Sequence, residues 1–137
     1  MITAVDSSVL LDVLGGDARF GDASRNALRQ SLLDGSVIAC EVVWAETTGW
    51  FRAASGSAAV GRLRVSYDSM GHASAELAGR AWGDYRAAGW PRQRLIGDFL
   101  VGAPASLQAD RLLTRDRGFY RRYFADLTVV DPTPSAS

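Results

Sequence analysis

The chain has 137 residues, of which 47% are hydrophobic and 22% are charged, as expected for a globular protein with one domain and a substantial core. The 15 basic and 15 acidic residues balance to a net charge of zero, so no overall basic field indicates a nucleic-acid partner. All the basic residues are arginines, which suit phosphate and carboxylate groups better than lysines do.

The single cysteine, Cys40, excludes an intramolecular disulfide and favours a reducing compartment. The N-terminus lacks the basic start and long apolar run of a signal peptide. No apolar run approaches the roughly 20 residues that a membrane-spanning helix needs. We therefore expect a cytoplasmic protein.

Short apolar runs alternate along the chain with segments of helical periodicity. Strands are expected at residues 2–5, 36–39, 64–67, 111–114 and 127–130, and helices at 9–14, 18–34, from 41, 57–63, 73–88 and from near 98. This alternation predicts a parallel sheet that is covered by helices on both faces. A single domain is expected over residues 1–131, followed by a disordered Pro- and Ser-rich tail at 132–137.

Carboxylates occur where such a sheet would bring side chains together. Asp6 and Asp116 each follow a predicted strand, and Asp98 lies near the start of a helix. Glu46 shares the predicted inward face of its helix with Val43. Ligands of open parallel sheets bind outside the carboxyl ends of the strands, so we expect the four acids to converge on one pocket.

Each acid also has a plainer interpretation. Asp6 and Asp98 are suitable helix N-caps, and Glu46 could lie at the edge of the apolar stripe and reach water or an arginine. If the four carboxylates do converge, they repel one another strongly at low dielectric. Mg²⁺ or Mn²⁺ would remove this repulsion, because both ions prefer oxygen ligands.

Other kinds of site are poorly supported. The sequence contains neither a phosphate-binding P-loop nor a dinucleotide-binding glycine motif after a strand. With one cysteine and one histidine, a zinc site is improbable. His72 is expected on the surface, and a Cys40–His72 catalytic dyad would require the two side chains to meet by chance.

Four segments together resemble PIN-domain proteins, specifically the ribonuclease toxins of bacterial VapBC toxin–antitoxin pairs. They are VDSSVLLDVL with Asp6, VVWAET with Glu46, RLIGDFLVGA with Asp98, and RLLTRDRGF with Asp116. The resemblance covers nearly the whole chain. It implies an α/β fold of three layers, α/β/α, around a short central parallel sheet.

The resemblance also implies a function. The four acids would be the catalytic residues of an endoribonuclease and would hold Mg²⁺ or Mn²⁺ directly or through water. Ser8 and Thr114 occupy positions where such proteins often place hydroxyl groups that assist the acids. A small cognate antitoxin would bind over the active site, in a groove near Trp44, Trp50 and Phe51, and a homodimer is expected.

A group of arginines near Asp116 is suited to contact RNA phosphates. Its members are Arg111, Arg115, Arg117, Arg121 and Arg122. The alternative is a solvated surface that has no partner.

Two residues depart from the family pattern. Pro104 lies in the middle of the helix that follows Asp98, where it removes a hydrogen bond and favours a kink that would displace Asp98. Arg115 precedes Asp116 at a position where asparagine is common. Two alternative functions therefore stay open: a DNA nuclease, against which the small size argues, and a catalytically inactive PIN-like module that binds RNA or protein.

Overall fold

A five-stranded parallel sheet forms the centre of the computed structural model, which describes residues 1–51, 55–89 and 96–133. The strands are β1 (Ile2–Val5), β2 (Ser36–Ala39), β3 (Ser66–Tyr67), β4 (Arg111–Leu113) and β5 (Val129–Val130), in the order β3-β2-β1-β4-β5. The helices are α1 (Ser7–Leu14), α2 (Gly21–Asp34), α3 (Glu41–Gly49), α4 (Ser55–Arg62), α5 (His72–Ala87), α6 (Ile96–Gln108) and α7 (Arg117–Tyr123). Within the described ranges, no helix has the length and apolar character needed to cross a membrane.

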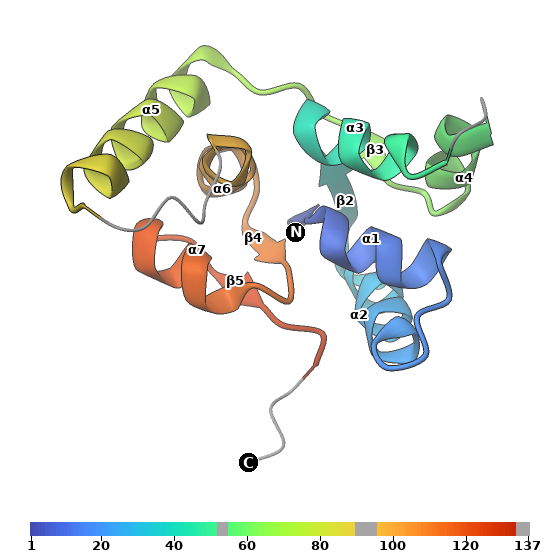
Figure 1. The fold of residues 1–137 in the computed structure, drawn as a ribbon. Helices are drawn as coiled ribbons and strands as arrows, with labels where there is room; N and C mark the ends of the chain where they lie inside the picture. The colour runs from blue at the N-terminus through green and yellow to red at the C-terminus, as the bar shows by residue number, and fades with distance from the viewer. Residues whose placement is uncertain (52–54, 90–95, 134–137) are drawn as a thin grey trace.

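The helices cover both faces of the sheet. Figure 1 shows α1, α2, α3 and α4 on one side of the strands and α5, α6 and α7 on the other. The predicted three-layer α/β/α architecture and the parallel sheet are therefore confirmed.

The central strand β1 pairs with strands from both halves of the chain. It pairs with β2 on one side and with β4 on the other, and Val5 lies opposite Leu113. The Asp6 N–H continues this ladder by donating a hydrogen bond to the Leu113 carbonyl at 3.0 Å. Consequently the residues that follow β1 and β4 lie side by side.

Several element boundaries differ from the sequence prediction. Helix α2 begins at Gly21 rather than at residue 18, because the Asp17 side chain accepts hydrogen bonds from the N–H groups of Arg19 and Phe20 and holds a turn. Helix α7 occupies a segment in which no helix was expected. Strand β3 is shorter than predicted, because Arg64 has a φ of 61° and interrupts the extended backbone before it. The predicted tail falls largely at residues 134–137, outside the described residues.

Helix α6 runs without interruption through Pro104. Proline has no N–H to donate to the carbonyl four residues earlier, which here belongs to Leu100. The Cys40 thiol donates to that same carbonyl, with an Sγ···O distance of 3.7 Å. The thiol thus supplies a weak donor where the helix lacks its own.

An aromatic cluster ties α6 to its neighbours. The Phe99 ring, fully buried in α6, lies 5.3 Å from the Trp82 ring of α5 and 5.1 Å from the Phe119 ring of α7, measured between centroids. Gly102, one turn further along α6, faces the Phe124 ring so closely that a Cβ at this position would overlap it. The cluster therefore sets the position of α6 relative to α7.

This close approach predicts that Gly102→Ala destabilises the protein by about 1–3 kcal/mol, the usual cost of overpacking a core. The matched control is Gly79→Ala in α5, where a Cβ would meet no atom within 4 Å. That variant should gain about 0.5–1 kcal/mol, because alanine favours the helix more than glycine does. Chemical denaturation of the two variants checks this, and a Gly102→Ala protein as stable as the wild type would contradict the packing.

Candidate active site

Asp6 lies at the carboxyl end of β1 and is the N-cap residue of α1. Its Oδ1 accepts a hydrogen bond from the Ser7 N–H at 2.8 Å, which confirms the capping interpretation. Its Oδ2 accepts hydrogen bonds from the hydroxyls of Thr114 at 2.8 Å and Ser8 at 3.4 Å. The residue is only 9% exposed, and this burial raises the pKa of its carboxyl, partly offset by these hydrogen bonds, while the charge of Asp116 raises it further.

A buried hydroxyl connects Asp6 with the loop that carries Asp116. Thr114 follows β4 and is fully buried. Its Oγ1 donates to Asp6 and accepts a hydrogen bond from the Asp116 N–H at 3.0 Å. The Thr114 hydroxyl therefore fixes the two strand ends relative to each other, and its assistance to catalysis stays a prediction.

Glu46 and Asp98 approach the same region from α3 and α6. Partial loss of hydration raises the pKa of the Glu46 carboxyl, and the negative charges of Asp6 and Asp98 raise it further. Asp98 lies on the first turn of α6 and remains within this electrostatic reach despite Pro104. The expected displacement by Pro104 does not remove Asp98 from the group.

Glu46 is more exposed than its expected place on the inward face beside Val43 implies, although it lies within electrostatic reach of Asp6 and Asp98. Only Val43 and Thr47 are buried on α3, while Glu46 is exposed and Trp50 is 57% exposed. Helix α3 thus presents Glu46 at the rim of the site. This agrees with the plainer interpretation that Glu46 lies at the edge of the apolar stripe.

A buried phenol from α7 faces all four acids. Tyr120 is 2% exposed; burial raises its pKa, and the negative charges of the four acids raise it further. These acids are Asp6, Asp98, Asp116 and Glu46. The four carboxylates therefore lie within electrostatic reach of one buried phenol, which stays protonated. Tyr120 was not among the residues singled out from the sequence, because no helix was expected in its segment. It lies one helical turn after Asp116.

The donor chemistry of this group suits a hard divalent cation. Its potential ligands are carboxylate oxygens. Loss of hydration, and after it the charge of neighbouring acids, raises the pKa of Asp6 and of Glu46, and a cation would offset the repulsion between them. In the part of the chain that the structure describes, no three acidic, histidine or cysteine side chains are arranged to hold a metal ion together.

The predicted arginines lie in different parts of the structure and do not form one group. Arg111 begins β4, at the opposite end of that strand from Asp116, and its Nη2 donates to Asp34 at 2.9 Å. The Arg115 guanidinium donates from Nε and Nη2 to both carboxylate oxygens of Asp12, at 2.7 and 3.0 Å. These two arginines are held in ion pairs within the fold.

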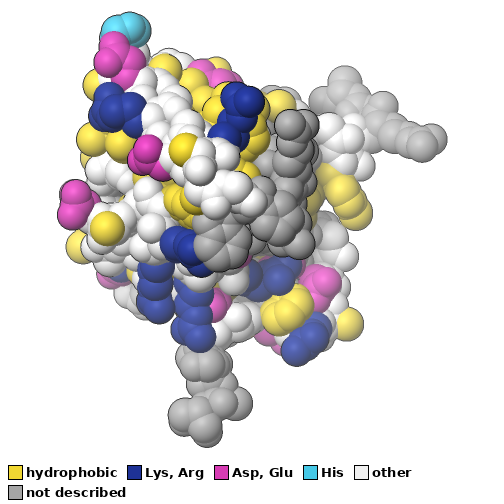
Figure 2. All heavy atoms as spheres, turned by 60° about the vertical axis from the view of Figure 1, so that its left-hand side comes forward, with side chains coloured by type: hydrophobic (Ala, Val, Ile, Leu, Met, Phe, Trp, Pro, Cys, Tyr) yellow, Lys and Arg dark blue, Asp and Glu magenta, His cyan; other side chains and the backbone are white. Residues whose placement is uncertain are grey.

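The other members lie on α7. Arg117 is the first residue of that helix, 3.7 Å from Asp131, and Arg121 and Arg122 are in its last turn and exposed. Figure 2 shows basic side chains gathered on the lower part of the face that carries α7, with acidic side chains among them. Contact of any of these arginines with RNA stays a prediction.

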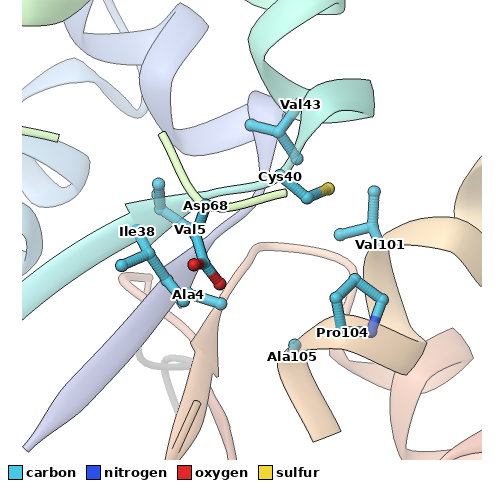
Figure 3. Close-up of a pocket in the computed structure, with 9 residues that line it drawn as sticks. All are labelled: Ala4, Val5, Ile38, Cys40, Val43, Asp68, Val101, Pro104 and Ala105. Carbon is cyan, nitrogen blue, oxygen red and sulfur yellow. The ribbon is translucent and has the colours of Figure 1, made fainter. Parts of the chain in front are cut away.

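A separate crevice lies between β1, β2 and α6 (Figure 3). It is lined by Ala4, Val5, Ile38, Cys40, Val43, Asp68, Val101, Pro104 and Ala105. None of the four acids of the candidate site is among these residues, and the lining is mostly apolar, so it is a different place from the candidate site.

Cys40 and His72 do not form a dyad. Cys40 is buried, whereas the His72 side chain is 89% exposed and lies 3.1 Å from Glu76 within α5. The surface position predicted for His72 is confirmed.

The family of the chain follows from its sequence over most of its length. Residues 3–125 match the PIN domain family. The chain therefore belongs to the PIN domain family.

Solved structures of toxin–antitoxin proteins share this fold. VapBC2 from Rickettsia felis, bound to a DNA fragment from its promoter, aligns with a TM-score of 0.70 and 15% identity over 96% of this chain and 98% of that one. VapBC-1 from nontypeable Haemophilus influenzae gives 0.69 and 16% over 98% and 100%. Mycobacterium tuberculosis VapC20, a Sarcin-Ricin loop cleaving toxin, gives 0.55 and 16% over 80% and 86%. No curated protein sequence matches the chain significantly.

The raised pKa of Glu46, caused first by loss of hydration and then by the charges of Asp6 and Asp98, predicts a pH-dependent effect of Glu46→Gln. Because the pKa of Glu46 is raised above its ordinary 4.5 in the folded protein, its ionisation opposes folding at neutral pH. The variant should therefore raise the Tm of the metal-free protein at neutral pH. The gain should disappear below about pH 4.5, where the group is protonated in both states.

Thermal melts across this pH range measure the effect. Asp84→Asn, which removes an exposed carboxylate from α5, is the matched control and should show no such gain. A gain from Glu46→Gln that persists in acid would show that the ionisation of Glu46 is not its cause.

Proposed function

We propose that the protein is a metal-dependent endoribonuclease that acts as the toxin of a toxin–antitoxin pair. The observation that carries this proposal is the meeting of Asp6 and the Asp116 loop at the carboxyl ends of β1 and β4 through the Thr114 hydroxyl, with Glu46 within electrostatic reach of Asp6 and Asp98. Membership of the PIN domain family supports a nuclease, and the description of VapC20 as a Sarcin-Ricin loop cleaving toxin supports RNA as the substrate.

In this proposal the four acids are the catalytic residues and hold Mg²⁺ or Mn²⁺ directly or through water. A divalent cation in such a site lowers the pKa of bound water and offsets charge on the phosphate. Thr114 keeps the Asp6 carboxylate oriented through its 2.8 Å hydrogen bond, and Ser8 assists at 3.4 Å. Tyr120 of α7, which is 2% exposed, lies within electrostatic reach of the same four acids.

The α7 arginines supply the positive charge that an RNA backbone requires. Arg121 and Arg122 are exposed, and Arg117 is partly exposed in the first turn of the same helix. They lie on the helix that begins directly after Asp116, so flanking phosphates would meet them beside the acids.

We also propose a small cognate antitoxin as partner, with the exposed aromatic surface near α3 as its docking place. Trp50 is 57% exposed and its ring packs edge-to-face on Phe51 at 5.2 Å. Trp44 packs similarly on the exposed Tyr67 of the edge strand β3, at 5.6 Å. The resemblance to VapBC toxins further leads us to propose a homodimer in the cytoplasm.

The proposal predicts RNA cleavage that requires Mg²⁺ or Mn²⁺ and stops when EDTA removes the metal. Asp98→Asn should abolish or severely reduce cleavage, since asparagine lacks the negative charge that attracts the metal. If Asp98 serves only to stabilise the first turn of α6, Asp98→Asn should leave cleavage nearly unchanged, because asparagine serves a helix start about as well as aspartate.

The measurement uses the purified protein with total RNA and with single-stranded DNA, followed by mapping of the cleaved ends. Full cleavage in EDTA would contradict the metal requirement. Cleavage of the DNA alone would favour the DNA nuclease, and absence of cleavage with either metal would favour the inactive PIN-like module.

The partner proposal predicts that the product of the neighbouring reading frame co-purifies with this chain and inhibits its cleavage of RNA. Replacing the exposed Trp50 by alanine should weaken this association, because an exposed aromatic contributes buried apolar area to an interface. A product that neither binds nor inhibits would contradict the toxin–antitoxin assignment while leaving the nuclease assignment intact.

A further inference from the structure

A buried ion pair lies beside the four acids and belongs to none of the roles described so far. Asp12, in the second turn of α1, is only 4% exposed. Its Oδ2 accepts hydrogen bonds from Arg115 Nε at 2.7 Å and from the Ser24 hydroxyl at 2.7 Å, and its Oδ1 accepts one from Arg115 Nη2 at 3.0 Å. A two-pronged arrangement of this kind fixes orientation as well as charge.

The surroundings of Arg115 hold its guanidinium in place. Its Cζ lies 4.1 Å from the centroid of the Phe20 ring, within the range of a cation–π contact. Phe20 is itself held by the turn in which Asp17 accepts a hydrogen bond from the Phe20 N–H at 2.7 Å. The Asp17 N–H in turn donates to the Asp12 carbonyl at 3.0 Å. The connection between α1 and α2, here called the cradle, thus packs against the Arg115 side chain from the C-terminal part of the chain.

The cradle anchors the loop that carries Asp116 at a second point. Thr114 is held to Asp6 at the start of α1, and the next residue, Arg115, is held to Asp12 on the same helix. Asp6 and Asp12 are separated by six residues, or about 9 Å along a helix. Asp116 follows immediately. Hydrogen bonds to two residues, Asp6 at the N-cap of α1 and Asp12 within it, therefore fix where the Asp116 backbone lies relative to Asp6.

We propose that Asp12 and Arg115 are positioning residues that hold Asp116 in register with Asp6, and that Arg115 is therefore not a phosphate contact. The inference rests on the proposed nuclease function. It explains why a buried carboxylate occupies α1 beside a group of acids that already repel one another: the Arg115 charge, together with the Ser24 hydroxyl, compensates Asp12.

The two roles of Arg115 predict different responses to substitution. Arg115→Lys keeps the positive charge but loses the fork, so a positioning role predicts a loss of kcat, whereas a phosphate contact would largely survive. Asp12→Asn removes no group that could attract RNA. It should nevertheless lower kcat if the pair positions Asp116, and should leave or improve activity if Arg115 merely binds phosphate.

The experiment measures RNA cleavage by the wild type, Asp12→Asn, Arg115→Lys and the double variant. We expect each single variant to lower kcat roughly 10–100-fold, as substitutions of residues that orient metal ligands do, with KM unchanged. The kcat of the double variant should be no lower than that of the less active single variant, because the two residues act as one unit. A KM effect without a kcat effect, or full activity of Asp12→Asn, would overturn the proposal.

A second readout does not depend on catalysis. The rise in Tm caused by Mn²⁺ should be smaller in Asp12→Asn than in the wild type, because a misplaced Asp116 would weaken binding of the ion. An equal rise in both proteins would overturn the positioning role. If the wild type shows this rise but cleaves no RNA, the proposed function is contradicted, and the comparison of melts still decides the positioning role. If the wild type shows neither the rise nor cleavage, both proposals are contradicted.

Two controls separate positioning from general loss of stability. Leu28→Ala removes a buried side chain of α2 outside the ion pair, so it should lower Tm without lowering kcat at a temperature where the protein is folded. Arg25→Gln breaks the exposed 3.3 Å pair with Asp22 on the same helix and should change neither. A loss of kcat in Leu28→Ala as large as that in Asp12→Asn would overturn the assignment.

Discussion

The parallel pairing of β1 with β4 is the constraint on which the candidate site depends. It places residue 6 beside residue 114, with the Asp6 N–H on the Leu113 carbonyl and the Thr114 hydroxyl on the Asp6 carboxylate. Other elements of the site are positioned from this pair of strand ends. Helix α1 begins directly after Asp6, α7 begins directly after Asp116, and the Phe99 cluster ties α6 to α7. The fold thus brings together acids that are more than a hundred residues apart in the sequence.

The same arrangement has an electrostatic cost. Asp6 is buried beside another carboxylate, and Glu46 feels the charges of Asp6 and Asp98. Asp12 is equally buried but has a guanidinium fork and a hydroxyl as partners. Asp12 is thus compensated by partners inside the fold, whereas the pKa values of Asp6 and Glu46 are raised, first by loss of hydration and then by the charges of neighbouring acids, as is common at functional sites.

Much of the fold could be predicted from the sequence, because strand and helix periodicities are local properties. The strand ends at Asp6 and Asp116 and the parallel sheet follow from them. Helix α7 was not predicted in this way, because its seven residues are too few for a helical period to be distinguished from a turn. The Arg115–Asp12 pair joins residues 103 positions apart, so no local pattern shows that Arg115 is held within the fold. The exposure of Glu46 depends on how α3 packs, which the stripe alone does not determine.

We propose that Asp6, Asp98 and Asp116, with Glu46 at the rim, bind one or more divalent cations. The most direct measurement is the anomalous scattering of crystals grown with Mn²⁺, for the wild type and for Asp116→Asn. We expect a peak among the oxygens of these carboxylates that is lost or greatly reduced in the variant. Crystals at saturating Mn²⁺ with no peak at this site, or with an equal peak in Asp116→Asn, would contradict it.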